Sequence, residues 1–507
     1  MSTTRQIKVG AILSYLSIAP NIVAGLIYTP WMVRQIGQGD YGLYTLANSL
    51  ITLFLVDFGL GSAVSRYIAK YRAENRQDKI DNFLGVVFKL YLIIDAVIVV
   101  ALTIVYFLLD KIYINMPREE LERFRVIYIM AASFAVVNFP CVSFNGILNA
   151  YEKFIQMKLA DVMYRVLLVA LTVLALFLGH GVYALVAVHA IVGLLIIIYK
   201  FIVIKRQLPV KANIHFRDRS LYVDLFGFSI WTTVAALSQR LVFSITPSIL
   251  GVVASSTAIA VFGIVATIEG YTYTVTGALN GMFMPRVARI YSSDRATEQV
   301  FPLLLGVGKF QFAVNGLIIA GFAVIGKDFI RLWMGPGYEQ AYYGILLVTI
   351  PGLFYNSLEV ANTAMVVQKK VKVQAEIGMG VGLINVILSF WLSGRWGVVG
   401  ACWSIFAAYS FRAIAYLAVI WKKMKLDIPR FVMKCYVAMG IPIIAAIILT
   451  SLLITKEIDG WAMLIMKGAV VTVVYAVMVF AVGLDAGERA ACLRLLRNRI
   501  RRADEKG

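Results

Sequence analysis

The stretch VYALVAVHAIVGLLIIIYKFIVI, residues 182–204, is apolar apart from one histidine, His189, one lysine, Lys200, and two tyrosines. An α-helix rises about 1.5 Å per residue, so about 20 residues cross the roughly 30 Å hydrocarbon core of a bilayer. The stretch is therefore typical of a membrane-spanning helix. Similar stretches recur along the chain, and we predict fourteen spans, at 10–33, 41–65, 83–109, 124–147, 159–178, 182–204, 223–250, 256–281, 301–325, 340–365, 374–393, 397–421, 431–454 and 461–484.

The composition and the distribution of charge agree with a membrane protein of fixed orientation. Hydrophobic residues make up 60% of the chain, charged residues 15%, and the mean hydropathy is +0.81. Most Lys and Arg residues outside the spans lie at the amino terminus, in every second gap and in the carboxyl-terminal tail, which places both termini in the cytoplasm. The net charge of +20 therefore belongs to short loops beside anionic lipid, such as 66–79 and 205–219, and we expect no nucleic-acid partner.

Motifs for catalysis or for cofactor binding are missing from the sequence. The four cysteines are scattered without metal-ligand spacing, and we find no P-loop and no nucleophile motif. The longest gap predicted to lie outside the cell membrane, around residues 110–123, is too short for a catalytic domain. We therefore expect no cofactor, no metal and no enzymatic activity, with any energy taken from ion gradients.

The first twelve spans repeat weakly at a distance of about 217 residues. A six-helix unit begins and ends on the same membrane side, so its copy enters in the same direction, as in transporters with parallel repeats. The predicted fold is all-α, with two six-helix bundles around a central cleft and an added helix pair. The matches are Thr29-Pro30 with Thr246-Pro247, Asn145 with Asn362, Lys153 with Lys370, and Gly181-Val182 with Gly397-Val398.

These repeats predict four regions of the chain. The amino-terminal bundle is placed at 1–210, the second bundle at 211–425 and the added pair at 426–485. The tail at 486–507 is basic and amphipathic, and we expect it to lie on the cytoplasmic membrane surface. The first span is expected to be retained, because no small-residue cleavage site follows it.

The sequence around the second span resembles a known family. Residues 34–44 read RQIGQGDYGLY, residues 55–61 read LVDFGLG, and Arg66-Tyr67 follow. This pattern is similar to the opening of the bacterial polysaccharide transporter family, which includes the Wzx-type O-antigen flippases. That family belongs to the multidrug/oligosaccharidyl-lipid/polysaccharide exporter superfamily. Looser similarities follow at Met284-Pro285-Arg286 and at 397–401, and the fourteen spans extend the resemblance over the whole chain.

The resemblance implies a flippase in the bacterial inner membrane. Its substrate would be a polyprenyl-pyrophosphate-linked glycan, moved from the cytoplasmic to the periplasmic leaflet, with H⁺ or Na⁺ as the coupling ion. Membrane lipid and a polysaccharide polymerase are the further partners it implies. Three alternatives stay open: a flippase for the peptidoglycan lipid precursor, a multidrug or cation antiporter of the same superfamily, and, in another class, a membrane-embedded polysaccharide polymerase.

Charged residues inside the spans are the candidate site residues. A charge at the bilayer centre costs about 2.5–3.5 kcal/mol even on an insertion scale, so each requires a partner or a wet cavity. Arg and Lys suit the phosphates of the substrate, and a buried carboxylate can load and release a proton. The predicted substrate-binding residues are Arg66, Lys89, Arg165, Arg240, Lys309 and Arg412, and the predicted ion-coupling residues are Glu269, Glu359 and Asp95.

Some of these charges also have a plainer interpretation as structural ion pairs. Asp57, beside two glycines of the family-like motif, is predicted to anchor a turn, and His189 is predicted to bond a neighbouring helix in preference to relaying protons. Charges one helical turn apart, or on neighbouring spans, can neutralise each other. The pairs considered are Asp161 with Arg165, Arg240 with Glu269, and Glu359 with Arg412.

Overall fold

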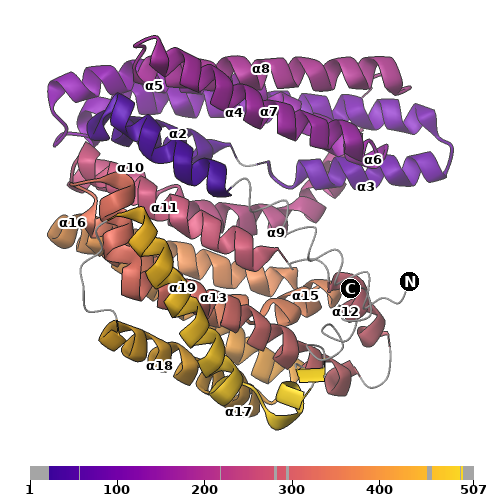
Figure 1. The fold of residues 1–507 in the computed structure, drawn as a ribbon. Helices are drawn as coiled ribbons and strands as arrows, with labels where there is room; N and C mark the ends of the chain where they lie inside the picture. Colours follow the sequence, from indigo (N-terminus) through magenta and orange to yellow (C-terminus); the bar gives the residue numbers. More distant parts are fainter. Residues whose placement is uncertain are drawn as a thin grey trace, which may run out of the picture. The chain divides into compact units, whose positions relative to one another are not determined.

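The computed structural model describes residues 22–55, 57–216, 218–278, 283–292, 296–453, 460–490 and 493–494. Helices make up almost all of this part of the chain, and it contains no strand, so the predicted all-α class is confirmed (Figure 1). Most of the first predicted span lies outside the described residues, although 22–36 are helical. The predicted surface helix of the tail also falls largely outside them.

The helices group into two compact units, one formed by residues 23–264 with 371–404. Within this unit α7 packs along α8, α3 along α6, and α5 along both α2 and α8. Its helices are α2 (Gln38–Phe54), α3 (Leu60–Ala73), α4 (Gln77–Ile112), α5 (Arg118–Asn138), η1 (Phe139–Val142), α6 (Ser143–Ala150), α7 (Phe154–Phe177), α8 (Val182–Gln207), α9 (Arg219–Phe243) and α10 (Thr246–Val253).

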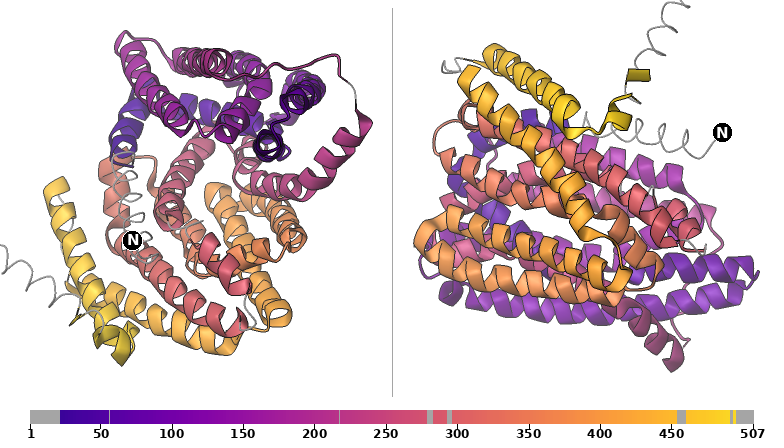
Figure 2. Two further views of the ribbon diagram at one scale, coloured as in Figure 1. Left: turned by 90° about the vertical axis from the view of Figure 1, so that its right-hand side faces the viewer. Right: turned by 90° about the horizontal axis from the view of Figure 1, so that it is seen from below.

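The other unit is formed by residues 265–370 and 405–507. Its long helix α13 packs against α14, α18 and α19, and α18 lies beside α19, in yellow in Figure 2. The unit contains most of α11 (Ser256–Gly277), α12 (Met284–Tyr291), α13 (Ala296–Met334), α14 (Glu339–Asn356), α15 (Glu359–Val367), the second part of α16 (Val371–Met424), α17 (Ile428–Phe431), η2 (Val432–Val437), α18 (Ala438–Leu453), α19 (Trp461–Met478) and η3 (Val479–Gly483). The predicted domain boundaries at 210, 425 and 485 stay predictions.

Ten of the described helices are long and apolar enough to cross a membrane, or eleven if the bent pair α14 and α15 forms one span. The protein is therefore a multi-pass membrane protein. Two predicted spans, 374–393 and 397–421, lie within α16, which contains a non-helical residue at Gly397 (φ 55°, ψ −130°). The total of fourteen spans and the layout of the repeats stay predictions.

The second predicted span, 41–65, is two helices and not the single helix expected. The chain leaves helical geometry after Phe54, and Phe58 and Gly59 adopt φ of 52° and 68°. Asp57 stabilises this break. Its Oδ2 accepts a hydrogen bond from the Gly61 amide at 3.0 Å, and its Oδ1 accepts one from the Tyr91 hydroxyl at 2.6 Å. The interpretation of Asp57 as the anchor of a turn is confirmed.

His189 of α8 bonds neighbouring helices, as the sequence predicts. Its Nε2 lies 2.8 Å from the hydroxyl of Tyr44 in α2, and its Nδ1 lies 3.3 Å from the hydroxyl of Tyr164 in α7. Both ring nitrogens therefore have partners within one unit, and the side chain joins three helices.

Two turns share one backbone pattern at the spacing of the predicted repeat. In the turn between α6 and α7, the amides of residues 151, 152 and 153 donate to the carbonyls of 147, 149 and 148. In the turn between α15 and α16, the amides of 368, 369 and 370 donate to 364, 366 and 365. Glu152 and Lys369 both adopt left-handed geometry, with φ of 57° and 59°. Lys153 and Lys370 thus lie in turns of the same type, which also end helices at 74–76 and 178–180, so the repeat itself stays a prediction.

Candidate functional site

A helix break inside a predicted span positions the candidate site. Helices α14 and α15 are bent by 55° across a short interruption, where the Leu358 amide donates to the Tyr355 carbonyl at 3.1 Å. Ser357 in the same turn donates its hydroxyl to the Phe354 carbonyl at 2.7 Å. Non-helical backbone at membrane depth is tolerated where it is buried in protein or lines a wet cavity. The break therefore marks a polar position in the interior of this unit.

Arg412 of α16 lies against this broken helix, held by tyrosine rings. Its guanidinium carbon is 3.7 Å from the ring centre of Tyr355, 5.7 Å from that of Tyr409 and 6.0 Å from that of Tyr416. The guanidinium also donates a hydrogen bond to the Tyr355 hydroxyl. Cation–π contacts stabilise a partly desolvated arginine, because the ring faces are electron-rich. The tyrosine rings thus hold this cation at one place in the span.

A chain of weaker polar contacts continues from the tyrosines to a carboxylate. The Tyr416 hydroxyl lies 3.5 Å from Asn362 Oδ1, and Asn362 Nδ2 lies 3.4 Å from Glu359 Oε2. Glu359 begins α15, where the positive end of the helix dipole favours a negative charge. Arg412 acts electrostatically on Glu359, and their expected pairing as an ion pair stays a prediction.

Glu269 of α11 belongs to the same neighbourhood. Its charge acts on the hydroxyls of Tyr409 and Tyr273, and Tyr273 in turn interacts electrostatically with Glu359 and Arg412. All five groups belong to one compact unit. Arg412 and Glu359, both predicted from the sequence, are therefore linked through Tyr416 and Asn362, and Glu269 of the same unit acts electrostatically on Tyr409 and Tyr273. We call Arg412, Glu269 and Glu359, with Tyr273, Tyr355, Tyr409, Tyr416 and Asn362, the Arg412 cluster.

The chemistry of the Arg412 cluster suits a ligand that is both anionic and rich in hydroxyls. A guanidinium binds phosphate oxygens through a planar fork of N–H donors, which a lysine cannot reproduce. Tyrosine rings and hydroxyls provide flat apolar faces together with hydrogen-bonding groups. The two carboxylates can hold a proton or a small cation.

A related but simpler arrangement occurs in the other unit. Lys200 of α8 donates to Asn145 Oδ1 at 2.9 Å, where the repeat matches Asn145 with Asn362. The spacing of 216 residues that relates Gly181 to Gly397 relates Lys200 to Tyr416, so both asparagines accept from equivalent positions. When the two predicted copies are aligned at this spacing, Gly193 corresponds to Tyr409 and Ile196 corresponds to Arg412. If the predicted repeat holds, Arg412 and Tyr409 have no counterpart of the same kind in the first copy.

Four of the other five predicted cations lie in the unit that contains Lys200, on separate elements. Arg66 is exposed on α3, and Arg165 is exposed on α7. Lys89 of α4 donates to the backbone carbonyl of Phe216 at 2.9 Å. Arg240 is half-buried on α9, and its proposed pairing with Glu269, which belongs to the other unit, stays a prediction. None of these four residues belongs to the unit that contains the Arg412 cluster, and their predicted role in substrate binding stays a prediction.

The structure describes the surroundings of two further acids, Asp161 and Asp95. Asp161 pairs with Lys158 at 3.5 Å, so the expected pairing with Arg165 is wrong as a salt bridge. The reason is geometric, because Lys158 lies one turn earlier on the same exposed helix face. Asp95 of α4 is 9% exposed, and its buried Oδ1 has no hydrogen-bond partner among the described residues.

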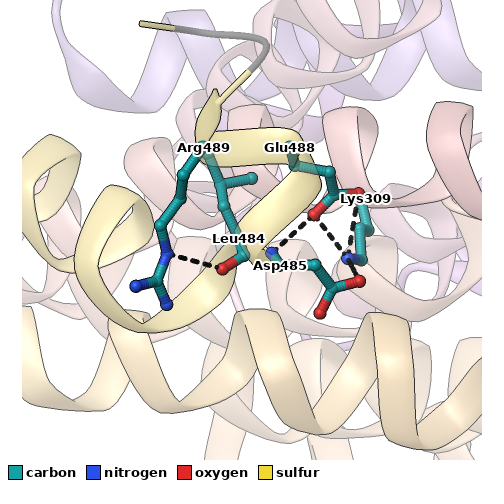
Figure 3. A network of polar contacts seen from close by, with 5 residues as sticks. All are labelled: Lys309, Leu484, Asp485, Glu488 and Arg489. Carbon is teal, nitrogen blue, oxygen red and sulfur yellow. Dashed lines mark hydrogen bonds and ion pairs between the residues drawn. The ribbon is translucent and has the colours of Figure 1, made fainter.

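Lys309 of α13 forms ion pairs with Asp485 and Glu488, two residues that follow η3. Its ammonium lies 2.8 Å from Glu488 Oε2 and 3.3 Å from Asp485 Oδ2, and its side chain is 5% exposed (Figure 3). The amide of Asp485 also donates to Glu488 Oε2 at 2.8 Å. Lys309 therefore anchors the carboxyl-terminal segment, and its predicted role in substrate binding stays a prediction.

Sequence reasoning missed Tyr355, Tyr409 and Tyr416 of the cluster, and it did not treat Lys200 as a site residue. Tyr409, Arg412 and Tyr416 follow one another at spacings of three and four residues, which places them on one helix face. That spacing was a usable signal, although tyrosines are common at membrane interfaces. Lys200 lies near the predicted cytoplasmic end of its span, where lysines are frequent.

Comparison with known proteins identifies the family. A family model described as "Polysaccharide biosynthesis protein" matches residues 9–290, more than half of the chain. The chain belongs to the polysaccharide transporter family. This member of the multidrug/oligosaccharidyl-lipid/polysaccharide exporter superfamily is 23% identical to the putative O-antigen transporter of Salmonella typhi, over 79% of this chain and 91% of the relative. It is also 21% identical to the uncharacterized membrane protein EpsK of Bacillus subtilis (strain 168), over 92% and 94%.

Solved structures of transporters share the fold of this polysaccharide transporter. The lipid II flippase MurJ, in its inward closed conformation, superposes with a TM-score of 0.72 at 15% identity, covering 92% of this chain and 98% of that one. An inward-facing multidrug resistance transporter of the MATE family superposes with a TM-score of 0.66 at 14% identity, covering 81% and 98%. These likenesses show the fold, and the expected absence of enzymatic activity stays a prediction.

Proposed function

We propose that this protein is a flippase for polyprenyl-pyrophosphate-linked glycans, moving the head group from the cytoplasmic to the periplasmic leaflet of the bacterial inner membrane. Family membership and the relative named as a putative O-antigen transporter support a polysaccharide precursor as the substrate. The observation that carries the proposal is the Arg412 cluster, in which a cation, four tyrosines and two carboxylates share one unit. A polysaccharide polymerase would take up the delivered product.

In this proposal Arg412 binds the pyrophosphate, and the tyrosines around it bind the first sugars. A pyrophosphate inside a span must be neutralised, because an unpaired charge there is costly. Arg66, Lys89, Arg165, Arg240 and Lys309 would extend the electropositive path along which the head group moves. The polyprenyl tail would stay in lipid, so the protein has to enclose only the polar head.

Ion coupling is assigned to the acids. Glu269 and Glu359 lie near the cation that would bind the substrate, so loading them with H⁺ or Na⁺ changes the charge that a pyrophosphate encounters. Coupling needs such a difference in interaction between the loaded and the empty state. Asp95, with a buried and unpartnered oxygen, is the candidate in the other unit.

Proteoliposomes test the proposal. Purified protein is reconstituted with a fluorescent undecaprenyl-pyrophosphate oligosaccharide, and an impermeant quencher reports the lipid in the outer leaflet over time. We expect faster translocation than in empty vesicles and a further increase with a proton or sodium gradient. In Arg412→Gln we expect the rate to fall towards that of empty vesicles. Arg395→Gln is the matched control, because Arg395 is an exposed arginine of the same helix α16, stacked on Trp391.

Other outcomes would contradict specific parts of the proposal. Translocation at the rate of empty vesicles under every gradient would contradict flipping of this substrate. Equal rates for wild type and Arg412→Gln would remove the Arg412 cluster from the path. A parallel assay with labelled lipid II distinguishes the peptidoglycan-precursor alternative, which predicts faster transport of that lipid than of the oligosaccharide.

A further inference from the structure

A second polar site lies outside the Arg412 cluster, on the side of the membrane that the charge distribution predicts to be cytoplasmic. An open cavity of about 640 Å³ is bounded by the end of α3, the start of α4, the turn between α6 and α7, and Pro209 after α8. All of these elements belong to one unit. The three connecting segments fall in the predicted cytoplasmic gaps 66–82, 148–158 and 205–222.

Arg72 is held in this cavity in one orientation. Its guanidinium carbon lies 4.4 Å above the ring centre of Tyr151, and its Nη1 donates to the carbonyl of Ala150 at 2.5 Å. The stacked ring fixes the plane of the guanidinium, and the hydrogen bond fixes its rotation. A guanidinium has five N–H donors, and this bond uses one of them. The arginine is exposed, so its other donors face a solvent-accessible cavity.

Two of the turns that form the cavity are hydrogen-bonded turns at helix C-termini. Asn75 and Glu152 both line it with left-handed backbone, at φ of 54° and 57°, and the amides of residues 74–76 and 151–153 donate to carbonyls in the last turns of α3 and α6. These hydrogen bonds hold each turn in one shape. The side chain of Gln77 joins the loops, donating to the Pro209 carbonyl at 2.6 Å and to Asp81 Oδ1 at 3.0 Å.

The lining of the cavity combines cationic and apolar surface. Arg76 is the second arginine, and its Nε lies 3.5 Å from Asp78, a pair exposed enough to exchange partners. Ala69, Ala73 and Ala150 with Ile80 provide the apolar part of the lining. Two arginines match a phosphate, and small apolar side chains leave room for a glycerol and the first carbons of an acyl chain. Basic pockets between helices on the cytoplasmic side are suited to anionic lipid head groups.

We propose that this cavity binds the phosphate of an anionic phospholipid from the cytoplasmic leaflet, with Arg72 and Arg76 as its ligands. Arg72 provides the prearranged fork, and Arg76 leaves Asp78 for the phosphate. The bound lipid would join α3, α4 and the turn between α6 and α7 at one point. The proposal does not depend on the glycan being the transported substrate.

Binding of short-chain lipids to the purified full-length protein in neutral detergent tests this site. Native mass spectrometry compares dioctanoyl-phosphatidylglycerol with dioctanoyl-phosphatidylcholine, which has the same chains without net charge. We expect preferential binding of phosphatidylglycerol, weakened about tenfold or more in Arg72→Gln, since a hydrogen bond between charged groups contributes roughly 1.5–3 kcal/mol. Arg76→Gln should give a smaller loss, because that arginine already has Asp78 as a partner. Arg206→Gln, an exposed arginine of the same unit that does not line the cavity, should bind as wild type.

A second measurement separates the lipid from a soluble phosphate compound. Glycerol 3-phosphate is added as a competitor, and we expect it to displace phosphatidylglycerol weakly, because it lacks the apolar part. Displacement by glycerol 3-phosphate at an equal concentration would overturn the lipid assignment in favour of a soluble phosphorylated ligand. Unchanged phosphatidylglycerol binding in both Arg72→Gln and Arg76→Gln, or equal loss in Arg206→Gln, would overturn the site. Arg72→Lys keeps the positive charge but loses the planar set of N–H donors of the guanidinium. An affinity for phosphatidylglycerol between those of the wild type and Arg72→Gln supports the geometry described.

Discussion

The guanidinium of Arg412 both stacks on the ring of Tyr355, with 3.7 Å between its carbon and the ring centre, and donates a hydrogen bond to the hydroxyl of the same residue. The two contacts join α16 to the end of α14, immediately before the helix break. A conformational change that moved either helix would have to break both contacts together. The position of this cation is therefore coupled to the geometry of the broken helix.

The first prediction concerns the shape of the cation at position 412. Arg412→Lys keeps the charge but loses the planar fork and most of the stacking on Tyr355. We expect the initial rate of glycolipid translocation to fall about tenfold or more, in line with the loss of a hydrogen bond to a charged group. The quencher assay in proteoliposomes measures it. A rate within a factor of two of wild type would show that charge alone is sufficient there.

The second prediction concerns the carboxylates. Glu269→Gln and Glu359→Gln keep the size and polarity of each side chain but cannot take up a proton or hold a cation. We expect transport without a gradient to persist, and the acceleration by a gradient to disappear in at least one of the two variants. The rates with and without each gradient are compared in the same vesicles. If both variants, and the pair combined, keep the full acceleration, the coupling site lies elsewhere, and Asp95→Asn becomes the next test.

The third prediction concerns the anchor of the carboxyl-terminal segment. Replacing Asp485 and Glu488 by Asn and Gln leaves the ammonium of Lys309 without a carboxylate while its side chain stays buried. We expect a loss of roughly 1–3 kcal/mol in stability, reduced by the exposure of the two acids, and faster proteolysis after Gly483. Adding Lys309→Met should restore much of the stability, because it removes the unpaired charge. Additive losses in the triple variant would show that the three side chains act independently.

The fourth prediction concerns the turn that divides the second span. Asp57→Ala leaves the buried hydroxyl of Tyr91 without its acceptor, and we expect a cost of about 1–3 kcal/mol in thermal unfolding measured in detergent. Combining it with Tyr91→Phe should cost less than the sum of the two single changes. Ser62→Ala, which removes an exposed hydroxyl from the same turn, is the control and should change stability little.

The fifth prediction concerns Lys200 of α8. Lys200→Gln keeps a side-chain N–H donor, on a shorter side chain, and removes the positive charge beside Asn145. If Lys200 contributes to the electropositive path, substrate affinity falls several-fold while thermal stability stays near that of the wild type. Unchanged affinity, together with a loss of stability, would assign Lys200 a purely structural role.

The hydrophobic runs predicted the helices well because burial in lipid requires both length and low polarity. The break after Phe54 was not visible in those runs, since apolar residues fill both sides of it and only the backbone angles at Phe58 and Gly59 reveal it. The acid beside the two glycines was the available signal. A hydropathy pattern reports where a segment resides and not whether its backbone is continuous.

The charges of the candidate site were found from the sequence because charged residues are rare inside spans. Which of them meet was not predictable, since it depends on how helices rotate and pack. Arg412, Glu269 and Glu359 come from three distant segments, whereas Lys309 meets acids that follow the last span. The tyrosines were overlooked because a single sequence does not distinguish an aromatic residue that packs from one that carries a cation.

The division of the second span at Asp57 has a consequence for how the chain is made. α2 has 17 residues and α3 has 14, so neither is long enough to be inserted as a complete crossing by itself. Asp57 leaves the ribosome 34 residues before Tyr91, the partner that later binds its carboxylate. The nascent segment therefore enters the translocon before Oδ1 of Asp57 has its partner, and its lateral release into lipid should wait until α4 has emerged.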